Sequence, residues 1–126
     1  MINIADQEVE MVSIRVAEKL GWQGMQFSQN GRLVGSPPGQ KRLTAVPSYA
    51  LDIKAAWEII DLLTKRQVRI SIVNEAIRGD IRNYVVEIGN PENPLAKASH
   101  RTIQVAVCLA FLKMPELRTS GDRNAL

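Results

Sequence analysis

The chain has 126 residues, 45% of them hydrophobic and 23% charged, which is the composition of one ordinary globular domain. Its formal net charge of +3 is mild, and without a dense basic stripe the sequence argues against a nucleic-acid-binding protein. A single cysteine excludes an intrachain disulfide, and no apolar run is long enough to span a membrane.

The first segment predicts a helix from Asp6 to Leu20. Its apolar residues recur every three or four positions and form one stripe, made of Val9, Val12, Val16 and Leu20. Gly21 follows as a C-terminal cap. The residues before the helix lack the basic start and continuous apolar run of a secretion signal, so we expect a cytosolic protein.

Two short extended runs follow at residues 25–28 and 32–34. They are joined by Gln29-Asn30-Gly31, and an Asn-Gly pair between such runs is the strongest short signal for a β-hairpin. The Ser-Pro-Pro-Gly sequence at 36–39 ends this hairpin, and residues 40–46 are predicted as a loop or an edge strand. The basic segment 36–42 is either an ordinary connection or a flap that closes over an anion.

A second helix is predicted to begin at Pro47 and Ser48, with Ser48 as its N-cap, and to continue to about Lys65. One face of this helix is apolar and includes Ile53, Trp57 and Ile60. Trp57 and Trp22 are interpreted as core or interface residues, with a stacking wall for a ring as the alternative, and Trp57 in particular is interpreted as a packing residue.

The second half of the chain predicts another pair of strands and a third helix. Residues 68–73 and 81–88 alternate between apolar and polar side chains, which indicates an antiparallel pair joined by a connection at 74–80. Residues 89–94 contain two prolines and a glycine and are predicted to be irregular. The helix at 99–114 is apolar almost all round, so we expect it at the centre of the domain or against a partner subunit.

The predicted order of elements is helix, hairpin, helix, hairpin, helix. This order indicates an α+β fold, with a small antiparallel sheet layered with three helices (αββαββα, an α/β/α-type sandwich). We expect one domain over residues 1–114. Pro115 ends the third helix, and residues 115–126 are predicted to be a loose tail.

The reactive side chains of the sequence do not form a catalytic set. His100 is the only histidine, and no pattern supplies it with an orienting acid and a nucleophile. Cys108 lies among apolar residues, where burial raises the pKa of a thiol and makes it a poor nucleophile. The spacing of His100 and Cys108 matches no metal site. We therefore expect no enzyme activity, no metal and no cofactor.

Four arginines surround the second predicted hairpin. Arg66 and Arg69 precede and begin its first strand, while Arg78 and Arg82 lie on the connection and the return strand. The guanidinium group suits phosphates and stacks on bases, so these side chains could form an anion site if they converge. The alternative is a solvated face of the sheet.

Three segments carry a resemblance to a known family. They read Val-Ala-Glu-Lys-Leu-Gly-Trp at 16–22, Pro-Ser-Tyr-Ala-Leu-Asp-Ile-Lys-Ala-Ala-Trp-Glu at 47–58, and Thr-Ile-Gln-Val-Ala-Val-Cys-Leu-Ala-Phe-Leu-Lys at 102–113. Together they resemble the phage ABA-sandwich domain, a family of small bacteriophage proteins with a helix–sheet–helix sandwich. The resemblance implies a phage origin and this fold, and it does not imply an enzyme.

A small phage protein without catalytic residues fits a protein that binds and disables a component of the host. We therefore expect a non-catalytic homo-oligomer in the host cytosol that sequesters a nucleotide-derived immune signal. One alternative is a protein–protein inhibitor with an exposed apolar patch. The other is an enzyme that degrades the signal with Glu75 or His100 as its general base. The expected ligand-binding residues are Arg66, Arg69, Arg78, Arg82, Tyr84, Tyr49 and Trp57.

Overall fold

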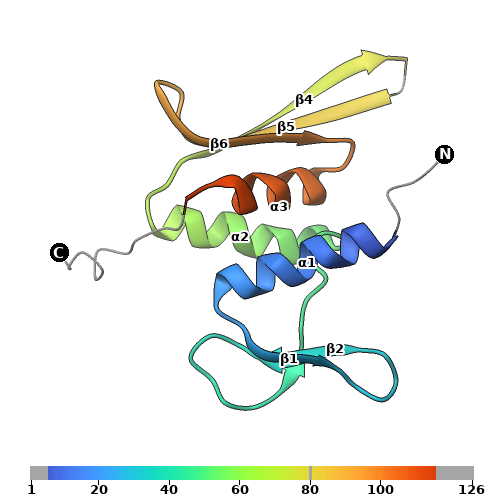
Figure 1. Cartoon of the computed structure of the whole chain (residues 1–126). Coiled ribbons are helices and arrows are strands. Elements are labelled where there is room, and N and C mark those ends of the chain that lie inside the picture. The colour runs from blue at the N-terminus through green and yellow to red at the C-terminus, as the bar shows by residue number, and fades with distance from the viewer. Residues whose placement is uncertain (1–5, 80, 116–126) are drawn as a thin grey trace.

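Three helices alternate with two groups of three strands along the chain (Figure 1). The element order is αβββαβββα, so the predicted α+β class with three helices and antiparallel strands is confirmed, with one more strand in each half. The predicted tail lies, from residue 116 onward, outside the described residues. The computed structural model describes residues 6–79 and 81–115, with the backbone alone described for Asp6, Gln7, Ile77, Arg78 and Ile81.

Helix α1 (Asp6–Leu20) has the predicted bounds, and Gly21 ends it. Gly21 has a φ of 109°, and its amide donates to the carbonyls of Ala17 and Glu18. The amide of Trp22 also donates to the Ala17 carbonyl, at 3.0 Å. This glycine-dependent closure of the helix turns the chain back and fixes where Trp22 lies.

The first sheet has the strand order β1-β2-β3 and is antiparallel. Strands β1 (Gln23–Phe27) and β2 (Leu33–Ser36) form the predicted hairpin. Strand β3 (Thr44–Ala45) confirms the edge strand that was one of two possibilities for residues 40–46. Most side chains of β1 and β3 are exposed, so this sheet contributes little to the core.

Helix α2 (Ile53–Lys65) begins later than predicted, because Asp52 and not Ser48 is its N-cap. The Asp52 carboxylate accepts a hydrogen bond from the amide of Lys54 at 2.9 Å. Residues 48–51 form a separate turn that buries Tyr49 and Ala50 before the helix starts. The buried face of α2 consists of Ala55, Ala56, Ile59, Ile60 and Leu63.

Trp57 lies outside that buried face. Its side chain is 51% exposed, so the interpretation of Trp57 as a packing residue is wrong. Leu51 and Ile53 are also exposed, at 62% and 44%. The apolar residues of α2 therefore cover a wider part of the helix surface than the fold buries.

The second sheet is antiparallel with the order β4-β5-β6. Strands β4 (Ile70–Arg78) and β5 (Ile81–Asn90) extend the predicted pair, so most of the expected connection at 74–80 is strand. Strand β6 (Asn93–His100) was not predicted: it overlaps the end of the segment expected to be irregular, 89–94, and the start of the helix expected at 99–114. Its Pro94 lies on an edge strand, where a missing amide donor is tolerated.

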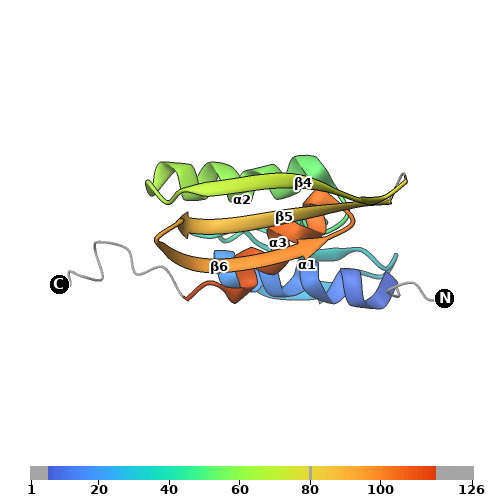
Figure 2. The same ribbon diagram turned by 90° about the horizontal axis from the view of Figure 1, so that it is seen from above.

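Helix α3 (Ile103–Lys113) is the centre of the fold. It packs against β5 and β6 on one side and against α1 and α2 on the other. Figures 1 and 2 show the helices on one face of the β4-β5-β6 sheet, with the small sheet on the far side of the helices. The layers therefore run sheet, helices, sheet, whereas the prediction had one sheet in an α/β/α-type sandwich. The apolar α3 is thus buried within one chain, and its composition does not require a partner subunit.

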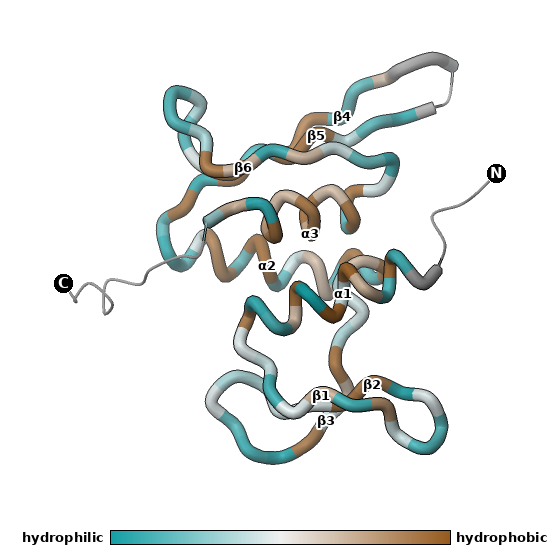
Figure 3. Tube along the Cα trace, in the orientation of Figure 1, coloured by the Kyte–Doolittle hydropathy of each residue, from teal (hydrophilic) through white to brown (hydrophobic). Residues whose placement is uncertain are grey.

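The core follows this arrangement. Figure 3 shows hydrophobic residues concentrated along α2, α3 and the middle of β4 and β5. Val86 and Ile88 of β5 are fully buried against the helices, as are Val107 and Cys108 of α3. Across the described ranges, 6–79 and 81–115, no helix combines the length and apolarity needed to cross a bilayer.

Candidate functional site

The C-terminal ends of all three helices meet around one cavity, here called the helix-end pocket. The helices run side by side in the same direction, so their last turns lie together (Figure 1). The cavity volume is about 720 Å³, within the range of small-molecule sites. Its lining is Lys19, Leu20, Trp22, Pro37, Pro38, Tyr49, Glu58, Asp61, Leu62, Lys65, Arg66, Phe111 and Met114.

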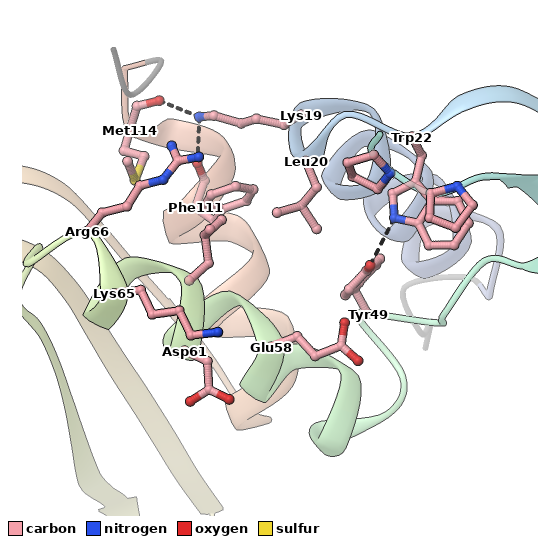
Figure 4. A pocket seen from close by; sticks show the side chains of 13 residues that line it. Lys19, Leu20, Trp22, Tyr49, Glu58, Asp61, Lys65, Arg66, Phe111 and Met114 are labelled. Atoms are coloured by element: carbon pink, nitrogen blue, oxygen red, sulfur yellow. Dashed lines mark hydrogen bonds between the residues drawn. The ribbon is translucent and has the colours of Figure 1, made fainter. Parts of the chain in front are cut away.

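An aromatic wall forms one side of the helix-end pocket. The indole Nε1 of Trp22 donates to the hydroxyl oxygen of Tyr49 at 3.2 Å (Figure 4). Pro37 and Pro38 also belong to the lining. Burial raises the pKa of Tyr49 to about 12, with the Trp22 hydrogen bond opposing the rise and the Glu58 carboxylate adding to it. The phenol is therefore neutral at physiological pH and offers a polar group without a charge.

Lys19 closes another side of the helix-end pocket. Its ammonium donates to the carbonyl oxygens of Phe111 at 2.7 Å and Met114 at 2.5 Å, and it lies 5.0 Å from the centre of the Phe111 ring (Figure 4). These carbonyls belong to the end of α3, where a helix carries unsatisfied acceptors and partial negative charge. Lys19 therefore joins the ends of α1 and α3.

The rim of the helix-end pocket carries four charged side chains of α2 in a fixed order. Glu58 and Asp61 come first along the helix, followed by Lys65 and Arg66 at its C-terminal end. All four are exposed. Within the described part of the chain, their side chains form no ion pair with one another or with other residues. The rim thus offers carboxylate acceptors at one end and cationic donors at the other.

The predicted convergence of the arginines does not occur. Arg82 is paired with Ala76 near the tip of the β4–β5 hairpin, whereas the Arg69 carbonyl accepts from Gly89 at the other end. The ladder between them is roughly 20 Å long at the usual rise per residue. Arg69 also precedes Ile70, so its side chain belongs to the opposite face of the sheet from Arg82. The strand register therefore keeps these two guanidinium groups apart.

Of the seven residues expected to bind ligand, Arg66 and Tyr49 line the helix-end pocket. Tyr84 is half-buried on β5 and packs against the core, and Trp57 lies on the exposed surface of α2. Arg78 ends strand β4, and its side chain lies outside the described residues. The described members of the predicted site therefore lie on separate surfaces, and of these Arg66 and Tyr49 line the cavity.

The groups considered for catalysis are also separated. Glu75 pairs with Asn83 and His100 with Tyr84, so Glu75 and His100 belong to opposite faces of the second sheet. Burial raises the pKa of Cys108 to about 12, which keeps the thiol protonated inside the core. Within residues 6–79 and 81–115, no three His, Cys, Asp or Glu side chains gather closely enough to hold a metal ion.

His100 makes folding dependent on pH. Its Nδ1 accepts a hydrogen bond from the Thr102 amide at 3.2 Å, next to the start of α3. Burial lowers the pKa of His100 below its ordinary 6.5, and the positive charge of Arg101 adds to this effect. The unfolded chain therefore binds this proton at a higher pH than the folded protein does. The stabilising contribution is present above pH 6.5 and is lost as the pH falls through the folded pKa.

We expect the free energy of unfolding to decrease as the pH falls from neutral to mildly acidic values, and His100→Gln to remove most of this decrease. Glutamine does not titrate, so the variant isolates the histidine from carboxylates that titrate at lower pH. Urea denaturation at a series of pH values measures the effect. The same slope in the variant and the parent would assign it to other groups.

The sequence interpretation did not place Lys19 or Phe111 in a site, and Trp22, considered there as a stacking wall, was not among the seven expected ligand-binding residues. The cap at Gly21 was a usable signal for Trp22, because the residue after such a glycine folds back over the helix end. No comparable signal existed for Lys19, whose partners are more than ninety residues away in the sequence.

Comparison with known proteins adds no relative: no protein-family model matches the chain, and no curated protein or solved structure matches it. The resemblance to the phage ABA-sandwich domain therefore stays a prediction. The helix-end pocket has to be interpreted from its own geometry.

Proposed function

We propose that this protein binds a nucleotide-derived small molecule in the helix-end pocket and sequesters it without changing it chemically. The observation that carries the proposal is that an aromatic wall and the exposed cations Lys65 and Arg66 line one cavity. A base would pack against Trp22, Pro37 and Pro38, while Lys65 and Arg66 would hold a phosphate. The resemblance to a phage family suggests that the ligand is a host defence signal.

The lining supports binding in preference to catalysis. Hydrolysis of a phosphodiester needs a general base or an activated nucleophile. The described lining contains no histidine, cysteine or serine, and its phenol is held in the neutral form by burial. The cavity therefore offers walls and charges to a ligand, and its described lining lacks the histidine, cysteine and serine that most often supply a base or a nucleophile.

The two tryptophans allow a direct binding assay. Trp57→Phe leaves Trp22 as the only tryptophan, and Trp57 is exposed and outside the pocket, so we expect this variant to fold normally. We expect its fluorescence to change on titration with cyclic dinucleotides or isomers of cyclic ADP-ribose. In that background Arg66→Ala should weaken binding about tenfold or more, because it removes a charge-assisted contact.

Arg69→Ala and Arg82→Ala are the matched controls, since both remove an exposed arginine outside the helix-end pocket. They should leave the affinity unchanged. Heating the complex and identifying the released molecule by mass spectrometry separates sequestration from catalysis, because a sequestered ligand is recovered intact. No fluorescence change with any nucleotide, or an altered ligand after heating, would overturn the proposal.

A second candidate function is inhibition of a partner protein. Leu51, Ile53 and Trp57 are exposed at the start of α2, and exposed apolar groups of this kind are typical of protein-binding surfaces. In this case Trp57→Ser would abolish complex formation with the partner, and Arg66→Ala would not. The two candidates thus predict opposite effects for the same pair of substitutions.

A further inference from the structure

We infer that the helix-end pocket selects a guanine-type base carrying a single phosphate group, with Glu58 bonding to the edge of the base and Arg66 to the phosphate. The inference rests on the proposed function and specifies its ligand. It follows from the order of charges along α2, from the position of Glu58 beside the aromatic wall, and from the helix ends around the cavity.

Glu58 is the acidic group nearest to the ring-binding wall. Figure 4 shows its side chain on the Tyr49 side of the pocket, while Asp61 points away from Tyr49 and Trp22. The charge of Glu58 helps to raise the pKa of the Tyr49 hydroxyl, which is a further sign that the two side chains lie close together. A ring lying against Trp22 would therefore present its edge to the Glu58 carboxylate.

An ionised carboxylate only accepts hydrogen bonds and can accept two in parallel. Guanine presents two adjacent donors on one edge, the N1–H and the 2-amino group, and matches this geometry. Adenine places an acceptor nitrogen beside its amino group, so one carboxylate oxygen would face a lone pair. The chemistry of Glu58 thus favours guanine over adenine.

The opposite end of the same helix suits one phosphate. Glu58 and Arg66 are eight residues apart on α2, roughly 12 Å along the helix axis. This separation places the base edge and the phosphate at opposite ends of the cavity. Lys65 and Arg66 outweigh the partial negative charge of the α2 C-terminus, which is about half an elementary charge. Glu58 and Asp61 add two negative charges to the same rim, which disfavours a polyphosphate.

The test compares GMP, IMP, AMP and GTP by Trp22 fluorescence in the Trp57→Phe background, with excitation at the red edge of tryptophan absorption. We expect GMP to bind about tenfold more tightly than AMP, with IMP between them because it lacks the 2-amino donor. GTP should bind no more tightly than GMP. Glu58→Gln should reverse the preference, since an amide pairs with adenine and places a donor against guanine.

Asp61→Asn is the matched control, because it neutralises a carboxylate of the same rim that faces away from the wall. It should preserve the preference for GMP. Equal affinity for GMP and AMP, or a GMP preference that survives Glu58→Gln, would overturn the inference while leaving the proposed function standing. If neither the mononucleotides nor the cyclic nucleotides change the fluorescence, both fall together.

Discussion

Gly89→Ala is expected to lower the free energy of unfolding by about 3 kcal/mol. Gly89 has a φ of 105°, which an alanine adopts only with strain. A β-carbon at this position would lie 2.7 Å from the backbone nitrogen of Leu95 and 3.2 Å from the carbonyl oxygen of Asn93. Both neighbours are backbone atoms of strand β6, next to the β5–β6 turn, so they cannot move aside without breaking the pairing of these strands.

Gly39→Ala is the control for the backbone conformation alone. Gly39 also has a positive φ, 77°, but a β-carbon there would meet nothing within 4 Å. We expect it to cost about 1 kcal/mol, the strain without the overlap. Urea denaturation of both variants gives the comparison. Equal losses in the two variants would mean that the turn at Gly89 relaxes and that close approach is not what this position requires.

The same turn explains the main difference between the predicted and observed folds. Gly89, Pro91 and Pro94 were interpreted as signals of irregular structure, and each is compatible with a tight hairpin once its place is known. Gly89 supplies the positive φ, Pro91 lies in the turn, and Pro94 lies on the edge strand β6. Local sequence cannot distinguish an edge strand from a loop, because the outer edge needs no amide donors.

The helices were predicted better than the strands because their signals are local. Periodic apolar residues and Gly21 gave α1 its observed bounds. For α2, the start was predicted too early, because residues 48–51 form a turn that buries Tyr49 in the core. Local sequence does not indicate that burial. The order of apolar residues in α3 predicted its burial, and tertiary packing alone decided that it lies at the centre of one chain.

The candidate site was predictable only in part, because local signals do not determine tertiary contacts. Arginines suit a phosphate wherever they stand, but their convergence depends on strand register, and the register separates Arg69 from Arg82. Arg66 lies in the helix-end pocket because α2 ends there. The rest of the lining comes from residues far apart in sequence that three parallel helices bring together. Local sequence patterns do not indicate the direction in which the three helices run relative to one another.

The three helix ends also impose an electrostatic condition on the fold. Each C-terminus carries about half of a negative elementary charge, and three of them face one cavity. Basic residues lie in the last turn of every helix, Lys19 in α1, Lys65 in α2 and Lys113 in α3. Lys19 is the one that bonds to a different helix, so it offsets the charge and fixes the arrangement at the same time.

Lys19→Met is therefore expected to lower the free energy of unfolding by about 2 kcal/mol. Methionine keeps an apolar stem of similar length and removes the ammonium. The carbonyls of Phe111 and Met114 then lose a charged donor at a half-buried position. Hydrogen bonds to a charged group contribute roughly 1.5–3 kcal/mol. Denaturation in urea, followed by circular dichroism, measures the loss.

Lys113→Met is the matched control, because Lys113 is an exposed lysine of the last turn of α3 whose ammonium lies 3.3 Å from the Lys97 carbonyl. It should cost about 0.5 kcal/mol, and added salt should reduce that cost because exposed charges are screened. The loss from Lys19→Met should persist in salt, since direct bonds to partly buried carbonyls are screened less. If the two variants lose the same stability and respond alike to salt, Lys19 acts only through the general field of the helix ends.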